Sequence, residues 1–245
     1  MMRYEAIIIG GGPAGISAAL TLSNMGREIA VISADYRDSG LYKAKRIDNY
    51  PGAKAVSGAD LLALMYEQLS GADGVTLIRG LATGAVKTSA GFMVTVGADV
   101  YECSALIIAI GADGTKTLPG EAELLGHGVS YCAVCDGALY CGKKVAVIKL
   151  RGDCEEDIAV LKRFNCEVAE ISSLEDRGDA ACVFILRAAI AHSAIMPGLE
   201  LSGGINTNID GVFAAGDCIG NPRQIAKAVG EGQLAAYSAN LLLTT

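Results

Sequence analysis

A glycine-rich turn near the start of the chain constrains its fold more than any other feature. Residues 4–9 are an apolar run that indicates a buried strand, and Gly10-Gly11-Gly12-Pro13-Ala14-Gly15 follows it directly. Apolar residues then recur at helical spacing from Ala14 to Met25, and Gly26 suits the position after a helix end. Residues 28–33 indicate a second strand. This order predicts a right-handed βαβ unit in a parallel sheet.

The three glycines at spacing GxGxxG have separate roles in a dinucleotide-binding site. Gly10 allows a tight turn, Gly12 lets backbone N–H groups approach a pyrophosphate, and Gly15 lets the helix pack closely on the strand. Asp35 follows about 20 residues later, at the end of the second strand, where a carboxylate can bind a ribose hydroxyl. The pattern therefore predicts dinucleotide binding rather than a purely structural turn, and it does not separate FAD from NAD.

Further along, the sequence continues to alternate strand and helix patterns. A long loop over residues 36–58 precedes an expected helix over 58–70, and residues 105–110 are an apolar run typical of a buried parallel strand. Between them we expect a meander of short strands at residues 75–78, 85–88, 92–96 and 100–103.

The character of the chain changes at a proline-containing connection over residues 115–120. Beyond it, a smaller unit is expected from strand 145–148, helix 155–164 and strand 167–171. A last helix is expected over residues 224–243. The chain as a whole therefore belongs to the α/β class.

Two of the eight cysteines have the spacing of a redox centre. Cys132 and Cys135 form a CxxC motif at an expected helix start, where they can close an exchangeable disulfide and the helix N-terminus favours a thiolate. Asp136 follows directly and is placed to move a proton when the dithiol opens or forms. An inert pair of thiols is the alternative.

The other six cysteines are scattered, mostly among apolar residues, and we expect them to be small buried hydrophobic residues. His127 and His192 do not supply the second close pair that a zinc site needs, so no metal is expected.

Charge and hydropathy exclude several classes of function. A net charge of −7 argues against generic nucleic-acid or anionic-membrane binding. No apolar run approaches the roughly 18 residues of a membrane span, and the chain enters a strand pattern at once, so we expect a cytoplasmic protein. Two basic clusters are either solvated surface or a docking patch for an acidic electron-carrier protein. They are Lys43, Lys45 and Arg46, and Lys143, Lys144, Lys149 and Arg151.

Several segments together resemble the low-molecular-weight thioredoxin reductases, over residues 1 to about 148 and 205–243. Gly10–Gly15 is similar to their FAD fingerprint, and Cys132–Gly137 is similar to their active site. The other matching segments are Asn49–Gly52 beside the flavin ring, Ile107–Ala112 with Ile110 in place of the usual Thr, Gly211–Asp217, and Arg223–Ile225.

The resemblance implies a Rossmann-like FAD-binding domain of the three-layer ββα type, discontinuous over residues 1–116 and 192–245. A shortened second α/β domain, residues 117–191, is inserted and carries the CxxC motif. The resemblance also implies a homodimer and a thioredoxin-like protein as substrate. The two domains would move about hinges at residues 115–120 and 187–197.

The same resemblance implies roles for individual residues. Cys135 would face the flavin, Cys132 would attack the disulfide of the partner protein, and Asp136 would be the acid/base. Asp217 would bind the ribityl chain, and the backbone of residues 223–225 would meet the pyrimidine edge. The implied FAD-binding residues are Gly10, Gly12, Pro13, Ala14, Gly15, Asp35, Asn49, Ala85, Gly111, Ala112, Gly216, Asp217, Arg223, Gln224 and Ile225.

The sequence departs from that family where NADPH should bind. Strand 145–148 runs into a loop with one glycine, in which Leu150 and Arg151 place side chains where the backbone should approach a pyrophosphate. Asp153, Glu155 and Glu156 add negative charge at the next helix start, and residues 170–176 offer carboxylates rather than arginines. The segment from Cys135 to Gly211 is also several tens of residues shorter than in the family.

NADPH binding in the usual mode is therefore not expected, with a degenerate but working NAD site as the alternative. FAD can accept single electrons, so a ferredoxin-like protein is a sufficient donor, as in the ferredoxin-dependent flavin thioredoxin reductases that the chain resembles. A deazaflavin donor fits as well. We expect an FAD-dependent thioredoxin-disulfide reductase, and keep an NAD(P)H-dependent enzyme and a flavin redox sensor without turnover as alternatives.

Overall fold

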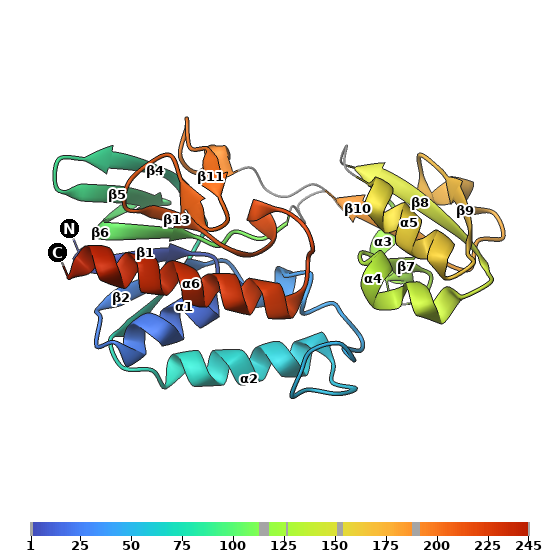
Figure 1. Cartoon of the computed structure of the whole chain (residues 1–245), viewed down its shortest axis with the longest axis horizontal. Helices are drawn as coiled ribbons and strands as arrows, with labels where there is room; N and C mark the ends of the chain where they lie inside the picture. Colours follow the sequence, from blue (N-terminus) through green and yellow to red (C-terminus); the bar gives the residue numbers. More distant parts are fainter. Residues whose placement is uncertain (1, 113–117, 126, 151–153, 188–191, 245) are drawn as a thin grey trace. The chain divides into compact units, whose positions relative to one another are not determined.

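A computed structural model describes residues 2–112, 118–125, 127–150, 154–187 and 192–244 (Figure 1). The chain forms two compact units. The first comprises Met1–Tyr42, Gly58–Gly111 and Ala189–Thr245, and the second comprises Lys43–Ser57 and Ala112–Ala188. Residues 43–57 thus belong by their contacts to the second unit, whereas the division predicted from the sequence placed them in the FAD-binding domain. The predicted hinges and domain boundaries include residues 115–117 and 188–191, which lie outside the described residues.

The first unit is built on a nine-stranded sheet. Its continuous path runs β11-β12-β13-β6-β1-β2-β3, and β4 and β5 extend from β6 as an antiparallel meander. The four central neighbours β13, β6, β1 and β2, together with β3, are parallel. The strands are β1 (Met2–Ile9), β2 (Ile29–Ser33), β3 (Val75–Arg79), β4 (Ala82–Thr88), β5 (Gly91–Val96), β6 (Asp99–Ile108), β11 (Leu201–Gly203), β12 (Asn206–Thr207) and β13 (Val212–Ala214).

Helices cover one face of this sheet and the meander covers the other (Figure 1). The helices are α1 (Pro13–Asn24), α2 (Gly58–Ser70) and α6 (Ile225–Leu243). The unit also contains three short helical turns, η1 (Tyr36–Asp38), η4 (His192–Ala194) and η5 (Gly216–Ile219). Because the central strands are buried on both faces, they read as continuous apolar runs. Ile7 and Ile8 of β1 are fully buried and point into the two different cores.

Two strand predictions are corrected by the structure. Strand 75–78 belongs to the parallel sheet beside β2 and not to the meander. Residues 100–103 and 105–110 are not separate strands, because β6 runs unbroken from Asp99 to Ile108. It pairs with β1 from Tyr101 to Ile108, while its first half also pairs with β5 and its second half with β13, so one strand serves both layers. Short-range patterns do not reveal such a change of partners.

The second unit contains a parallel four-stranded sheet in the order β7-β10-β8-β9. Apolar clusters cover both of its faces. Its elements are α3 (Glu121–Leu124), β7 (Val129–Ser130), α4 (Ala133–Asp136), η2 (Gly137–Tyr140), β8 (Lys144–Leu150), α5 (Glu155–Arg163), β9 (Glu167–Glu170), η3 (Leu174–Arg177) and β10 (Val183–Arg187). Among the residues described here, no helix has both the length and the hydropathy of a membrane-spanning helix.

Candidate active site

In the glycine-rich turn between β1 and α1, a side chain at either of two positions would overlap backbone atoms. A Cβ on Gly10, whose φ is +120°, would lie 2.1 Å from the carbonyl oxygen of Ala109. A Cβ on Gly15 would lie 1.8 Å from the carbonyl oxygen of Gly10. A Cβ on Gly12 would meet no atom within 4 Å. Gly10 and Gly15 therefore close the turn, while Gly12 borders open space.

That open space lies at the positive end of α1. The helix begins at Pro13 after Gly12 as N-cap, and in the described part of the chain no side chain caps it and no acid stands in its first turn. Exposed N–H groups without a neighbouring carboxylate favour an anion. Pro13, Ala14 and Gly15 thus fit the role predicted for them, that of holding a dinucleotide pyrophosphate.

Asp35 directly follows β2 and caps η1. Its carboxylate accepts a hydrogen bond from the N–H of Arg37 at 3.0 Å and pairs with the Arg79 guanidinium at 2.9 Å. The guanidinium of Arg37 lies 3.6 Å away. The side chain is 26% exposed, so one side of it remains open to a ligand hydroxyl.

The predicted second FAD segment lies where β13 leads into η5 and α6. Burial raises the pKa of the Asp217 carboxyl, and the charges of Arg223 and Lys227 oppose that rise. Lys227 pairs with Glu231 at 2.9 Å, and Glu231 accepts the N–H of Gly216 at 2.9 Å.

These contacts hold the loop at residues 216–225 to the start of α6, whose N-cap is Gln224 and whose first residue is Ile225. Lys227 and Glu231 were not among the residues predicted from the sequence. Their spacing of four residues on a predicted helix was the available signal.

Four further predicted FAD residues lie in different surroundings. Gly111 follows β6 with φ +73°, whereas Asn49 and Ala112 belong to the second unit. Ala85 in β4 is 2% exposed, and its N–H donates to the carbonyl of Ile195 at 2.7 Å.

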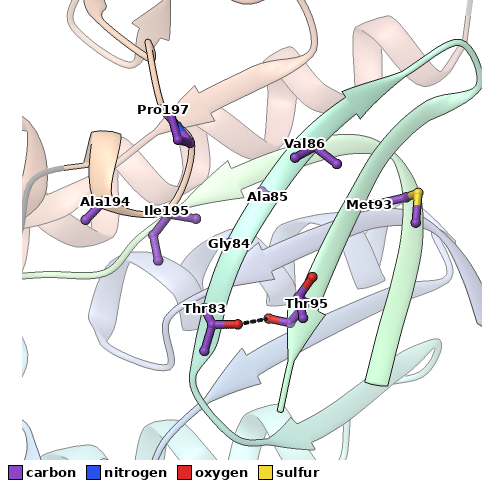
Figure 2. A pocket seen from close by; sticks show the side chains of 9 residues that line it. All are labelled: Thr83, Gly84, Ala85, Val86, Met93, Thr95, Ala194, Ile195 and Pro197. Carbon is purple, nitrogen blue, oxygen red and sulfur yellow. Dashed lines mark hydrogen bonds between the residues drawn. The ribbon is translucent and has the colours of Figure 1, made fainter. Parts of the chain in front are cut away.

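Ala85 also borders a cavity of about 250 Å³ between the meander and the segment at residues 194–197 (Figure 2). None of the nine described residues lining this cavity carries a thiol or an ionisable group, so it offers no redox chemistry.

The redox motif forms a disulfide at the start of α4. Cys132 is the N-cap, and its sulfur accepts the N–H of Cys135 at 3.1 Å. Cys135 is exposed and Cys132 is half-buried. The amide of Asn49 lies 4.0 Å from the Cys135 sulfur. The chain therefore presents an accessible disulfide whose inner sulfur is held by the backbone of its own helix.

Ser130 connects this disulfide to the predicted acid/base. Its buried hydroxyl donates to the Asp136 carboxylate at 2.7 Å and accepts the N–H of Cys132 at 3.2 Å. Ser130 was not among the residues predicted from the sequence. The signal was a serine two positions before the CxxC motif.

A buried ion pair lies directly beside this group. Glu121, 1% exposed, pairs with Arg187 at 2.5 Å and accepts the hydroxyl of Tyr131 at 2.5 Å and the N–H of Leu118 at 2.6 Å. Burial alone would raise the pKa of the Glu121 carboxyl, but these donors hold it below its usual range. The network ties the residue before Cys132 to α3 and to the end of β10.

The region where the sequence analysis looked for a nicotinamide site forms a regular unit with acidic residues at its described helix start. β8, α5 and β9 form a regular strand-helix-strand unit. The first turn of α5 carries Glu155, Glu156 and Asp157. Glu170 at the end of β9 pairs with Lys149 at 2.8 Å. The predicted Arg151 and Asp153 lie outside the described residues.

Several residues of the two basic clusters form ion pairs or contacts with aromatic or imidazole rings. Lys144 pairs with Asp179 at 2.9 Å, and Arg46 pairs with Asp48 at 2.7 Å. Lys45 contacts the ring of His127 at 2.8 Å, and Lys143 lies 5.7 Å from the ring centre of Tyr140. Within the described residues, no group of three or more His, Cys, Asp and Glu side chains could hold a metal ion.

The fold and site define a class of protein. Residues 4–149 match the family model of the pyridine nucleotide-disulphide oxidoreductases, flavoproteins that contain FAD. Thioredoxin reductase of Listeria innocua is 31% identical to this chain over 298 positions, which cover 96% of the chain and 92% of that protein. The chain belongs to the low-molecular-weight thioredoxin reductase family.

Further relatives support the same assignment. Thioredoxin reductase of Bacillus subtilis is 35% identical over 166 positions, 67% of this chain and 52% of that protein. A ferredoxin-flavin thioredoxin reductase of Clostridium acetobutylicum is 31% identical with a TM-score of 0.65, covering 100% of this chain and 98% of that one. For thioredoxin reductase of Streptococcus pyogenes the identity is 25%, the TM-score 0.83, and the coverage 99% and 98%.

These findings confirm the predicted family, the α/β fold class and the assignment to the thioredoxin reductase enzymes. The 298 aligned positions of the Listeria protein exceed the 245 residues of this chain, so the alignment contains gaps where that relative has additional residues. One cysteine prediction is wrong: Cys141 is exposed, because it lies in the turn between η2 and β8, while the other five free cysteines are buried.

Proposed function

We propose that this protein is a thioredoxin-disulfide reductase that takes its electrons from a ferredoxin-like protein and not from NADPH. When bound, FAD supplies a carrier that can accept single electrons and deliver an electron pair to a disulfide. The residues that would hold it are the turn at Gly10–Gly15, Asp35, and the loop from Gly216 to Ile225, with Asn49, Ala85, Gly111 and Ala112 as further contacts.

The residues of the second unit would carry out the sulfur chemistry. In the reduced protein, the Cys132 thiolate attacks the disulfide of a thioredoxin-like substrate, and Cys135 then displaces the substrate thiol to restore the Cys132–Cys135 bond. Asp136 holds or releases the proton of this exchange, and the Ser130 hydroxyl keeps its carboxylate oriented. The exposure of Cys135 and of Val134, 48% exposed, leaves room for a protein partner.

The acidic first turn of α5 is the observation that carries the choice of donor. In a nicotinamide site, the helix after the strand corresponding to β8 directs its positive end at the pyrophosphate. Here Glu155, Glu156 and Asp157 occupy that turn and would repel phosphate. Glu170 at the end of β9 is a carboxylate where a 2′-phosphate needs arginine. A one-electron protein donor needs none of these features.

The similarity to the Clostridium acetobutylicum ferredoxin-flavin thioredoxin reductase, which is 31% identical over the whole of this chain, supports the same donor. The basic loop at residues 43–57, which reaches Cys135 through Asn49, suits an acidic carrier protein. We also propose that the protein is cytoplasmic and that residues 117–191 form the inserted domain.

A homodimer is also part of this proposal. The outer face of α6 exposes Leu234, Tyr237 and Leu241, at 58%, 56% and 69%, with the spacing of one helical stripe. A second copy of the chain is the partner that we expect to cover it.

Turnover with alternative donors tests the function. Thioredoxin reduction would be followed with the FAD-loaded protein and either photoreduced ferredoxin or NADPH. We expect turnover with ferredoxin only, and loss of turnover in both Cys132→Ser and Cys135→Ser. Cys103→Ser serves as a control, because this cysteine is buried in the other unit. Equal turnover of the three serine variants would refute the disulfide route, and turnover with NADPH would refute the choice of donor.

A further inference from the structure

Three free cysteines gather in the second unit outside the Cys132–Cys135 pair. Cys141 follows η2, Cys166 precedes β9, and Cys182 precedes β10. The Cys166 thiol donates to the carbonyl of Tyr140 at 3.2 Å, and the Tyr140 hydroxyl is hydrogen-bonded to Cys182. Both Cys141 and Cys182 lie within electrostatic range of Cys166.

The sheet brings Cys141 and Cys166 together. Lys144 of β8 pairs in register with Glu167 of β9, so Lys143 and Cys166, directly before the two strands, are neighbours, and Cys141 lies two positions before Lys143. The N–H of Gly142 donates to the carbonyl of Phe164 at 3.0 Å, and the N–H of Glu167 donates to the carbonyl of Lys143 at 3.0 Å. Two backbone hydrogen bonds thus hold the turn after Cys141 to the residues on either side of Cys166.

The Tyr140 carbonyl sets an upper limit on the separation of the two cysteines. From its oxygen, the bonds through carbon and nitrogen to the Cα of Cys141 span about 4 Å. Since that oxygen lies 3.2 Å from the Cys166 sulfur, the sulfur is within about 7 Å of that Cα. A disulfide needs the two Cα atoms roughly 4.4–6.8 Å apart, so forming the bridge would require the turn between η2 and β8 to bring the Cα of Cys141 into that range of the Cys166 Cα.

The two thiols differ in accessibility. Cys141 is the exposed one among the six free cysteines, all of which lie in the described residues. Burial raises the pKa of the Cys166 thiol, and the neighbouring Cys141 raises it further. Cys132 and Cys135 are already oxidised in the resting disulfide. A soluble oxidant therefore meets the Cys141 sulfur first.

We propose that Cys141 and Cys166 form a second dithiol, which a hydroperoxide converts into a disulfide. The Cys141 thiolate attacks one peroxide oxygen, the O–O bond breaks, and a sulfenic acid and an alcohol or water result. The Cys166 sulfur then attacks the sulfenic sulfur, forming the S–S bond and releasing water. Two thiols lose two electrons and two protons, and the peroxide takes up both. The step is independent of the donor that reduces the flavin.

The bridge would join the segment after the catalytic helix to the start of β9. Gly137 in η2 already packs on Phe164 and Leu161, since a Cβ there would lie 3.1 Å and 3.2 Å from their side chains. The dithiol is thus a modification site beside the catalytic centre, on the framework that supports it.

Peptide mapping of the intact protein tests the proposal. The resting protein is treated with graded hydrogen peroxide, remaining thiols are alkylated, and unreduced peptides are analysed by mass spectrometry. We expect a Cys141–Cys166 cross-linked peptide that increases with peroxide and disappears on treatment with dithiothreitol. In Cys166→Ser, a dimedone adduct should accumulate on Cys141 at least several-fold above wild type. Cys218→Ser, a buried cysteine of the first unit, should leave the cross-link unchanged.

The wild-type map decides the question even where a variant folds poorly. Cys141 converted to sulfinic acid or joined to a second molecule, with Cys166 still open to alkylation, would overturn the proposal. A bridge between Cys166 and Cys182 without Cys141 would overturn it as well. Because the readout needs neither ferredoxin nor thioredoxin, its failure would leave the proposed function untouched.

Discussion

At the scale of single residues, Ser130 is the group that links the two halves of the redox motif. It donates to the Asp136 carboxylate and accepts the N–H of Cys132. We predict that Ser130→Ala slows thioredoxin reduction by about 10-fold to 100-fold, because a misplaced acid/base loses efficiency. The pH–rate profile should change shape as well, which a purely structural defect would not cause.

The matched control for Ser130 is Ser173, whose hydroxyl bonds the Asp176 carboxylate at 2.9 Å on an exposed surface of the same unit. Ser173→Ala should leave the rate and the profile unchanged, and flavin content should be normal in both variants. An unaltered pH–rate profile in Ser130→Ala would remove Ser130 from the account.

Substitutions of Gly15 and Gly12 should separate an effect on folding from an effect on cofactor binding. Gly15→Ala should destabilise the flavin-free protein by about 2 kcal/mol or more, because its Cβ would overlap the Gly10 carbonyl. Gly12→Ala should leave the stability of the flavin-free protein within about 0.5 kcal/mol and lower its flavin content, because its Cβ meets open space where a pyrophosphate would approach. Urea unfolding and flavin absorbance measure the two effects. Normal flavin retention in Gly12→Ala would contradict the proposed pyrophosphate position.

Sequence reasoning identified the residues whose role follows from local spacing. The glycines of the turn and the CxxC motif are of this kind. It missed Ser130 and the Glu121–Arg187 pair, because their partners are fixed by the tertiary structure. Arg187 is 66 positions from Glu121, and no periodic pattern connects them.

At the scale of elements, the buried Glu121–Arg187 pair connects α3 to β10. Replacing Glu121 by Gln leaves an arginine that is 11% exposed without its counter-charge, and should destabilise the protein by about 3 kcal/mol near neutral pH. Glu123→Gln, an exposed change in the same helix, should cost less than about 0.5 kcal/mol.

The pH dependence of this loss has a defined sign. Because the folded-state pKa of Glu121 is lowered from 4.5, its contribution is present above about that pH and is lost as the pH falls through the lower folded-state value. The difference in the free energy of unfolding between wild type and Glu121→Gln should therefore shrink in acid. A difference that stays constant down to the acid range would show that the charge of Glu121 is not the cause.

Most elements followed from periodicity, as in α2, which spans residues 58–70 as predicted. The errors concerned strand partners. β3 has the length and composition of a meander strand, yet it pairs in parallel with β2, because the crossover through α2 returns it to the central sheet. Partner choice depends on the whole sheet and is not contained in a five-residue pattern.

At the scale of the whole molecule, a net charge of −7 coexists with a basic loop at residues 43–57. We predict that Lys45→Glu and Lys54→Glu each lower kcat/KM for reduced ferredoxin by about 10-fold at low salt, with a smaller effect at high salt. Lys87→Glu, an exposed reversal on β4, is the control for overall charge. An equal loss in all three variants would place ferredoxin docking elsewhere.

The architecture of the molecule could be anticipated from its motifs, because they lie in the order that the family uses. The choice of electron donor could be inferred only from what replaces the usual nucleotide loop. Glu155, Glu156 and Asp157 of α5 are the clearest part of this difference from the usual loop, because they occupy the helix end where phosphate would bind.

Anaerobic flavin absorbance is the measurement that tests the central claim most directly. The FAD-loaded protein would be mixed with NADPH, then NADH, then reduced ferredoxin, while the flavin band is followed. The account predicts that both nicotinamide nucleotides leave the band unchanged and that ferredoxin bleaches it. Prompt bleaching by NADPH would contradict the account, and would show that the acidic start of α5 still admits a nucleotide.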